Sequence, residues 1–299
     1  MATGEVTVHV TPAATASSQS RTTLLVNLAW SVMLIVMAVI FFFPFFWTVA
    51  SSLKKVSELY VFPPILFPAV PQWKNYLTVL QTVPFLTWTW NSMLVVVLST
   101  AGVLLSSSLA AYAFARFEFR GREVLFIVTL GTMMLPAQVT LIPQFILFHD
   151  LGWIDTLNPL WIPSWFGGGA FYIFLLRQFI LSLPRELDEA AVIDGANPFQ
   201  ILWNILLPLC QPALATVAVI SLIGQWGDFI TPLIYLNSPV KFTLAIGLNF
   251  FRTVPDSGGL PTDHLLMAAS VMTTIPPILL FFVAQRYFVT GIVMSGIKG

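Results

Sequence analysis

Six long apolar runs, separated by more polar segments, dominate the pattern of this chain. Each run is close to the ~20 residues that a helix needs to cross a bilayer, and none shows the short alternating pattern of a membrane β-barrel strand. We therefore predict an all-α membrane protein with six transmembrane helices, over residues 24–47, 91–115, 124–148, 161–183, 211–236 and 265–288.

Prolines lie inside several of these runs. The third contains Pro136 and Pro143, and the sixth contains the sequence IPP. Proline is tolerated inside membrane spans because neighbouring helices can satisfy the carbonyl groups that it frees. We interpret these prolines as kinks, with a moving hinge as the alternative.

The first 20 residues differ from the rest, because they are rich in Thr, Ala and Ser, lack basic residues and show no periodicity. They predict a disordered tail. The first apolar run is too long for a signal-peptide core and no small-residue cleavage site follows it, so we expect it to be retained. The predicted organisation is a tail over residues 1–20 and one transmembrane domain over residues 21–299.

Composition supports a membrane protein. Of 299 residues, 57% are hydrophobic and only 9% are charged, whereas soluble domains carry about 25% charged residues. The net charge is zero, which argues against nucleic acid as a partner. Cys210 is the single cysteine, so no intrachain disulfide can form, and the three histidines show no metal-binding spacing.

The distribution of Lys and Arg predicts the orientation. Six spans place both termini on one side, and cytoplasmic termini put eight basic residues inside and five outside. The sequence RFEFRGRE, residues 116–123, is the clearest inside loop. We therefore expect cytoplasmic termini, with residues 184–208 also in the cytoplasm and the segments 50–87 and 237–264 on the outer side.

The segment 184–208 is unusual in so apolar a chain. Its central sequence ELDEAAVIDGAN holds four of the 13 acidic residues and no Lys or Arg. Gly195 suits the left-handed position after a helix, and Asn197 followed by Pro198 suits a cap and first turn. The pattern predicts a short helix, a turn at Gly195 and a second helix that ends at Pro208.

Two interpretations of this segment stay open on the pattern alone. Its first helix has acids on several sides, while Ala190 and Ala191 leave one flank narrow, which suits insertion into a groove of a water-soluble partner. The alternative is a solvated connection between the fourth and fifth spans. Roughly 25 residues is long for a plain connection, because most are only a few residues long.

The sequence EAAVIDGANPFQILWNILLP resembles the EAA loop of ABC importer permeases. That motif reads E-A-A, three residues, G, nine residues and I-x-L-P, and it is matched here at Glu189, Ala190, Ala191, Gly195, Ile205, Leu207 and Pro208. Further segments, such as GQWGDFITPLIYL and QRYFVTGIVMSGIKG, resemble the carbohydrate-uptake branch of maltose-permease type. The chain is most similar to the shorter of the two paired permeases in that branch.

This resemblance implies a permease subunit of a binding-protein-dependent ABC importer in the plasma membrane of a prokaryote. Its implied partners are a second permease, two ATP-binding subunits, an extracytoplasmic sugar-binding protein and membrane lipid. The EAA loop would be the coupling helix that seats on an ATPase subunit, with Glu189 as polar anchor, Asp194 beside the turn and Gly195 forming it. The C-terminal VMSGIKG resembles a tail that reaches the ATPase interface in some members.

The chain is not expected to be an enzyme. It contains no G-x-x-x-x-G-K-[ST] phosphate-binding loop, so ATP with Mg²⁺ would be bound and hydrolysed by the partner subunits. We expect no cofactor and no metal bound by this chain.

Candidates for the transport path are polar or aromatic residues within the spans. Asp228 is the one acid in the fifth run, and an intramembrane acid is a functional candidate by default, although a structural pairing is the alternative. The remaining candidates are Trp226, Gln225 and Asn91, followed by the weaker Gln138 and Gln144. The resemblance also allows the companion permease to carry most sugar contacts.

Three other functions are alternatives. An ABC permease for a non-sugar solute differs only in its ligand. An ion-driven secondary transporter would show internal repeats and paired intramembrane charges, which this sequence lacks. An intramembrane enzyme would need a catalytic constellation, and none can be assembled. The sequence does not identify the sugar.

Overall fold

The computed structural model describes residues 21–253 and 261–295. The predicted tail, residues 1–20, and the end of the VMSGIKG segment lie outside this part of the chain. Contacts divide the protein into two units, Met1–Trp47 and Thr48–Gly299, which we describe separately. The described residues form helices and turns without strands, which confirms the predicted all-α fold class.

The first unit consists, in its described part, of most of helix α1, Arg21–Ser52. Its apolar residues lie on every side of the helix, from Val26 to Trp47. A helix without a polar face is stable in lipid or against other apolar helices rather than in water. The structure therefore supports the first predicted span, which extends beyond residues 24–47 at both ends.

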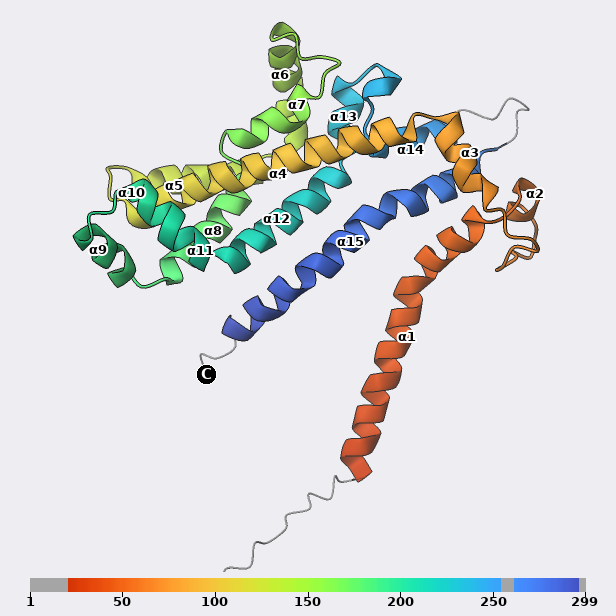
Figure 1. The fold of residues 1–299 in the computed structure, drawn as a ribbon, viewed down its shortest axis with the longest axis horizontal. Helices are drawn as coiled ribbons and strands as arrows, with labels where there is room; N and C mark the ends of the chain where they lie inside the picture. Colours follow the sequence, from red (N-terminus) through yellow and green to blue (C-terminus); the bar gives the residue numbers. More distant parts are fainter. Residues whose placement is uncertain (1–20, 254–260, 296–299) are drawn as a thin grey trace, which may run out of the picture. The chain divides into compact units, whose positions relative to one another are not determined.

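Helix α4, Phe85–Arg116, is the central element of the second unit. It packs along α8, Ala170–Ser182, and α12, Gln211–Trp226, and α12 in turn packs against α15, Asp263–Ser295 (Figure 1). With 32 residues and a rise of 1.5 Å per residue, α4 is roughly 48 Å long. It therefore has two well-separated ends.

Shorter helices complete the second unit. They are α2 Val56–Leu59, α3 Lys74–Thr82, α5 Arg122–Gly131, η1 Thr132–Met134, α6 Ala137–Asp150, α7 Asn158–Trp161, η2 Ile162–Trp165, α9 Glu186–Ile193, α10 Pro198–Ile201, η3 Leu202–Leu206, α11 Leu207–Leu209, α13 Ile230–Tyr235, η4 Pro239–Lys241 and α14 Leu244–Thr253. Within the described residues, four helical stretches are long and apolar enough to cross a membrane, one of them Asn158–Ser182, and six spans result if each of two bent pairs counts as one.

The segments on either side of the predicted membrane meet opposite ends of α4. Near its start, the indole nitrogen of Trp88 donates to the carbonyl of Pro239 at 2.7 Å. At its end, Arg116 forms an ion pair with Asp188. The segment after residue 236 and the segment 184–208 therefore lie at opposite ends of the second unit, as the predicted topology requires.

Three predicted spans, the third, the fourth and the fifth, are not continuous helices. The third, residues 124–148, is bent by 99° between α5 and α6, and Pro136 lies at the start of α6 because it cannot continue the preceding hydrogen-bonding pattern. Pro143 stays inside α6, and Pro276 and Pro277 stay inside α15. Of the predicted kinks, only the region of Pro136 coincides with a break between helices.

The fourth predicted span, residues 161–183, is broken at its glycines. Gly167, Gly168 and Gly169 all have positive φ angles, and α8 begins only after them. A Cβ atom on Gly168 would lie 2.2 Å from the hydroxyl oxygen of Ser107. Glycine is therefore required here both for the backbone conformation and for close approach to α4.

Candidate functional site

The segment 184–208 folds as its sequence pattern predicts. Helix α9 has three acids in its first turn, Glu186, Asp188 and Glu189, where they favour the positive end of the helix dipole. Gly195 follows the helix with φ +82°. The amide of Gly195 donates to the carbonyl of Val192 and the amide of Ala196 to that of Ala191, which is a Schellman C-cap.

The second helix begins with a capping box. The side-chain oxygen of Asn197 accepts from the amide of Gln200 at 3.0 Å, and the side chain of Gln200 accepts from the amide of Asn197 at 2.8 Å. Pro198 occupies the first turn, as predicted. The helix then widens into the π-helical turn η3 and continues through Pro208 to Leu209, one residue beyond the predicted end, before it bends by 81° into α12.

One face of this segment is buried in the protein itself. Ala191, Ile201, Leu202 and Leu206 belong to the hydrophobic cluster that also contains Tyr112 and Ala115 of α4 and Leu176 and Ile180 of α8. Ala190 is exposed, whereas Ala191 is 5% exposed. The idea that both alanines form a narrow flank facing a partner is therefore wrong for Ala191, whose small side chain fits against the protein's own helices.

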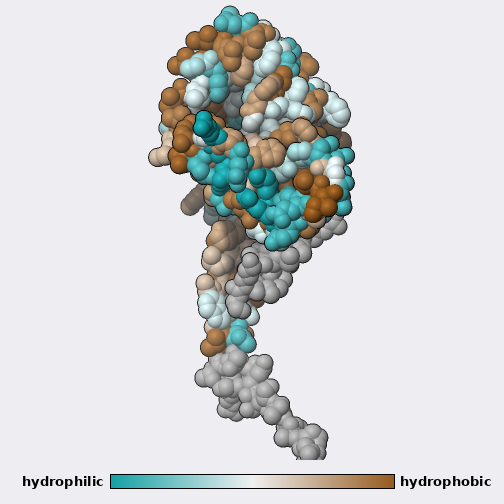
Figure 2. All heavy atoms as spheres, turned by 90° about the vertical axis from the view of Figure 1, so that its left-hand side faces the viewer, coloured by the Kyte–Doolittle hydropathy of each residue, from teal (hydrophilic) through white to brown (hydrophobic). Residues whose placement is uncertain are grey.

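The other face is exposed and partly apolar. Ile193 is 86% exposed and Phe199 74% exposed, and they lie close in sequence to the exposed acids Glu189 and Asp194. Figure 2, which views the end of the second unit carrying α9 and α10, shows hydrophobic residues among hydrophilic ones. Large exposed apolar side chains framed by polar ones are typical of a protein interaction surface. We call Glu189, Val192, Ile193, Asp194 and Phe199 the coupling surface.

An ion pair fixes this surface to α4. Arg116 Nε lies 2.7 Å from the carboxylate of Asp188, with side-chain exposures of 7% and 18%, and Arg116 Nη2 donates to the carbonyl of Leu183 at 3.1 Å. Burial raises the pKa of Asp188, and the nearby Arg116 guanidinium opposes that rise. The sequence analysis did not identify this pair. Its one signal was an Arg at the end of a span and an Asp in the next inside loop.

The structure places Asp228 outside a continuous helix. Helix α12 ends at Trp226, and one carboxylate oxygen of Asp228 accepts from the amide of Thr231 at 3.2 Å, at the start of α13. The single helix predicted over residues 211–236 is therefore interrupted. Asp228 lines a cavity of about 300 Å³ together with Gln138 and Gln144 of α6, so three of the predicted path residues share one cavity.

The other path candidates lie elsewhere. The indole of Trp226 donates to the carbonyl of Thr273 on α15 at 3.2 Å, and its ring lines a separate apolar cavity of about 230 Å³. Gln225 is half-buried and lines neither cavity. The Asn91 amide donates to the carbonyls of Val240 and Phe242. These contacts favour structural roles for Trp226 and Asn91, and a role in the path stays a prediction.

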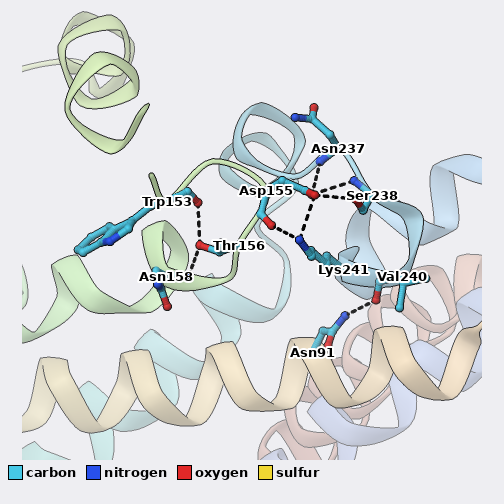
Figure 3. A network of polar contacts seen from close by, with 9 residues as sticks. All are labelled: Asn91, Trp153, Asp155, Thr156, Asn158, Asn237, Ser238, Val240 and Lys241. Atoms are coloured by element: carbon cyan, nitrogen blue, oxygen red, sulfur yellow. Dashed lines mark hydrogen bonds and ion pairs between the residues drawn. The ribbon is translucent and has the colours of Figure 1, made fainter. Parts of the chain in front are cut away.

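Asp155 organises the loops at the end of the unit where α4 begins (Figure 3). Its carboxylate accepts from the amides of Asn237 and Ser238 and from the Ser238 hydroxyl, and it lies 3.0 Å from Lys241 Nζ. The Ser238 hydroxyl and the two amides hold the pKa of Asp155 well below its usual range. Sequence analysis missed this residue. Its only signal was an isolated acid between two spans.

No group of three or more His, Cys, Asp or Glu in the described part of the chain is arranged to hold a metal ion.

Comparisons with known proteins agree on one type of protein. Residues 102–293 match the family model described as "Binding-protein-dependent transport system inner membrane component". The arabinooligosaccharides transport system permease protein AraQ of Halalkalibacterium halodurans is 37% identical over 72% of this chain and 75% of its own length. The trehalose/maltose transport system permease protein MalG of Thermococcus litoralis is 34% identical over 89% of this chain and 94% of its own.

A solved structure is also similar over almost its full length. It is a chain of a bacterial ABC transporter involved in the import of the acidic polysaccharide alginate, and it is 27% identical with a TM-score of 0.79. The match covers 90% of this chain and 98% of that chain.

Proposed function

This chain belongs to the family of binding-protein-dependent transport system inner membrane components, and from that premise we propose that it helps to import a carbohydrate. As a member of that family it is a permease subunit of an ABC importer, embedded in the membrane. Family membership decides against the ion-driven secondary transporter and the intramembrane enzyme. The names of two relatives, which transport arabinooligosaccharides and trehalose or maltose, support a sugar as the transported solute.

We propose that transport is coupled to ATP hydrolysis through the coupling surface. The observation that carries this proposal is a helix–turn–helix of EAA pattern whose inner face is buried against α4 and α8, while Ile193 and Phe199 stay exposed. Such a segment is rigid on one side and free to bind on the other. Glu189, exposed on α9, serves as the polar anchor, and Gly195 sets the angle between the two helices.

Energy comes from outside the chain in this proposal. Two partner subunits bind ATP with Mg²⁺ and hydrolyse it, and their closure moves α9 and the helices packed against it. A second permease completes the path, and an extracytoplasmic protein delivers the sugar. The chain itself binds no cofactor. The termini and the coupling surface face the cytoplasm, while η4 and the Asp155 loop face outward, as the distribution of Lys and Arg favours.

The test is the ATPase activity of the complete transporter, assembled from this chain with a partner permease, ATPase subunits and a binding protein. Neutral monosaccharides, disaccharides and oligosaccharides are added one at a time, with glutamate and phosphate as non-sugar solutes. We expect one sugar class to stimulate hydrolysis in the presence of the binding protein. Stimulation by a non-sugar solute alone would retain the importer and replace the substrate. Failure to assemble with any ATPase would overturn the role of the coupling surface.

A further inference from the structure

Helix α6 contributes polar side chains to the wall of a cavity. Gln138, Thr140 and Gln144 line the 300 Å³ cavity together with the apolar Leu141 of the same helix. Ile142, 69% exposed, and Ile146, 56% exposed, do not line it. Polar side chains that gather at a cavity on a helix of a predicted membrane span are candidates for contact with a transported solute.

The facing wall of the cavity is held in a defined position. The ring of Tyr235 on α13 stacks on Phe145 with centroids 6.2 Å apart and meets Phe148 edge-on at 5.3 Å. The carbonyl of Tyr235 accepts from the amide of Asp155 at 2.7 Å. These contacts join α6, α13 and the Asp155 loop. The polar groups of the cavity are therefore presented by a packed wall rather than by a free loop, and preorganisation of this kind favours ligand binding.

The lining has the chemistry of a site for hydroxyl groups. Two side-chain amides and two threonine hydroxyls can each donate and accept, and the Asp228 carboxylate accepts strongly. Leu141, Ile230 and Ile234 add aliphatic surface for the C–H groups of a sugar ring. The volume of about 300 Å³ lies at the lower end of the ~300–1,000 Å³ typical of small-molecule sites, so it suits one ring rather than a chain.

The charge of the cavity lining determines whether a neutral or an anionic sugar is favoured there. The described residues that line this cavity include one carboxylate and no Lys, Arg or His. An anionic sugar would bring a second negative charge close to Asp228 without a cation to balance it, which is unfavourable in a membrane interior of low dielectric constant. The solved relative imports the acidic polysaccharide alginate. A site with this lining favours a different substrate class.

We propose that the cavity between α6 and α13 is a binding subsite for one ring of a neutral, polyhydroxylated carbohydrate, and that Asp228 disfavours acidic sugars there. This proposal rests on the proposed function. In the complete transporter, the amides of Gln138 and Gln144 hold the ring hydroxyls, and Asp228 accepts from one hydroxyl while it also caps α13.

The test measures uptake into proteoliposomes that contain the complete transporter. The sugar that stimulates ATPase activity is supplied with its binding protein, and galacturonate oligosaccharides serve as the acidic competitor. We expect Gln144→Leu to raise the half-saturating sugar concentration about five- to tenfold, as loss of one or two hydrogen bonds predicts. Gln178→Leu, the same change at an exposed position of α8 outside the cavity, is expected to leave it unchanged.

Asp228→Asn tests the charge without removing the cap, because an asparagine side-chain oxygen still accepts from the Thr231 amide. We expect this variant to lose at least part of the discrimination against galacturonate oligosaccharides. If the wild type takes up a sugar and neither Gln144→Leu nor Asp228→Asn changes that uptake, the subsite is overturned and the proposed function stays intact. Absence of any sugar-dependent uptake by the wild type would instead overturn the proposed function.

Discussion

At the residue scale, two arginines each lie near a carboxylate, but only one of the two ion pairs is buried. Arg116 and Asp188 form an ion pair at 2.7 Å with side-chain exposures of 7% and 18%. Arg185 lies 4.0 Å from Glu118, and these side chains are 56% and 82% exposed. Exposed pairs contribute little because water screens them, whereas removal of one partner from a buried pair leaves an unbalanced charge. Only the first pair is therefore expected to fix α9 to α4.

Replacement of Arg116 by Leu is expected to lower stability by about 3 kcal/mol, the lower end of the range for breaking a buried pair. Arg185→Leu, the matched control, is expected to cost less than about 1 kcal/mol. Thermal unfolding of the detergent-solubilised protein measures both. The double variant Arg116→Leu/Asp188→Leu should recover part of the loss, because no charge then stays buried alone. Equal effects of the two single arginine variants would show that the Arg116 pair has no special role.

Asp155 predicts a dependence of stability on pH. Hydrogen bonds from the Ser238 hydroxyl and from the amides of Ser238 and Asn237 lower its pKa below the ordinary value of 3.8. A carboxyl group with a depressed folded-state pKa stabilises the protein fully above its unfolded pKa, and this stabilisation is lost as pH falls toward the folded pKa. The contribution of Asp155 is therefore present at neutral pH and decreases below about pH 4.

The variant Asp155→Asn is expected to have a lower Tm than the wild type at pH 7, and the difference is expected to shrink at pH 3. Asp150→Asn serves as the control, because the Asp150 side chain is 71% exposed and its ion-pair partner in the described chain, His149, is 69% exposed and charged only when protonated. A Tm difference for Asp155→Asn that is the same at both pH values would show that the carboxylate form contributes no stability.

At the scale of elements, the segment from α9 to α11 combines a fixed face with an exposed face. The π-helical turn η3 precedes Pro208, which has no amide hydrogen and whose ring would collide with the carbonyl four residues earlier in a regular α-helix. A wider turn relieves that conflict. The same residues also bury Leu202 and Leu206 against the cluster of α4 and α8. The geometry of the coupling surface therefore depends on both helices of the motif.

Ile193 tests the exposed face. Because its side chain is 86% exposed, Ile193→Asp is expected to leave folding and membrane insertion intact. It is expected to lower co-purification of the ATPase subunits at least tenfold, since a charge would be buried at the centre of an apolar contact. Val240→Asp, at an exposed position of η4 at the other end of α4, is the control and should have no effect on ATPase binding. Normal ATPase binding by Ile193→Asp would place the contact elsewhere.

At the scale of the whole molecule, α4 connects the two ends of the second unit. Ser92 accepts from the amide of Leu244, Ser99 donates to the carbonyl of Leu160, and Thr100 shares a hydrogen bond with Ser221 of α12. Polar contacts between helices fix their relative positions in an apolar environment. Movement of α9 is therefore expected to reach the outer loops through α4 rather than through a flexible segment.

The proposed orientation can be measured with single cysteines. Ile193→Cys and Val240→Cys place exposed thiols at opposite ends of α4, and the native Cys210 is 1% exposed. A membrane-impermeant maleimide is expected to label Val240→Cys in intact cells and Ile193→Cys only in inside-out vesicles. The reverse pattern would invert the topology, and labelling of both positions from one side would contradict a membrane crossing between residues 193 and 240.

Much of the fold followed from local sequence signals. The apolar runs predicted where helices cross the membrane, because a bilayer demands about 20 apolar residues wherever a helix crosses it, and the described chain has four to six candidate spans. Gly195, Asn197 and Pro198 correctly located the turn and the cap of the second helix, since both depend on the backbone preferences of single residues. The EAA pattern identified the family because its positions lie close together in the chain and can be read without the tertiary structure.

Only the tertiary structure decided which residues meet. Gln138 and Gln144 reach the same cavity as Asp228, and Asp155 binds residues 82 to 86 positions away. The burial of Ala191, the pairing of Arg116 with Asp188 and the break before Asp228 likewise depend on how helices pack. Hydrophobicity requires only that the apolar runs lie in the membrane, so it leaves the mutual rotation and register of the helices open. Those are set by close packing and by hydrogen bonds between distant residues.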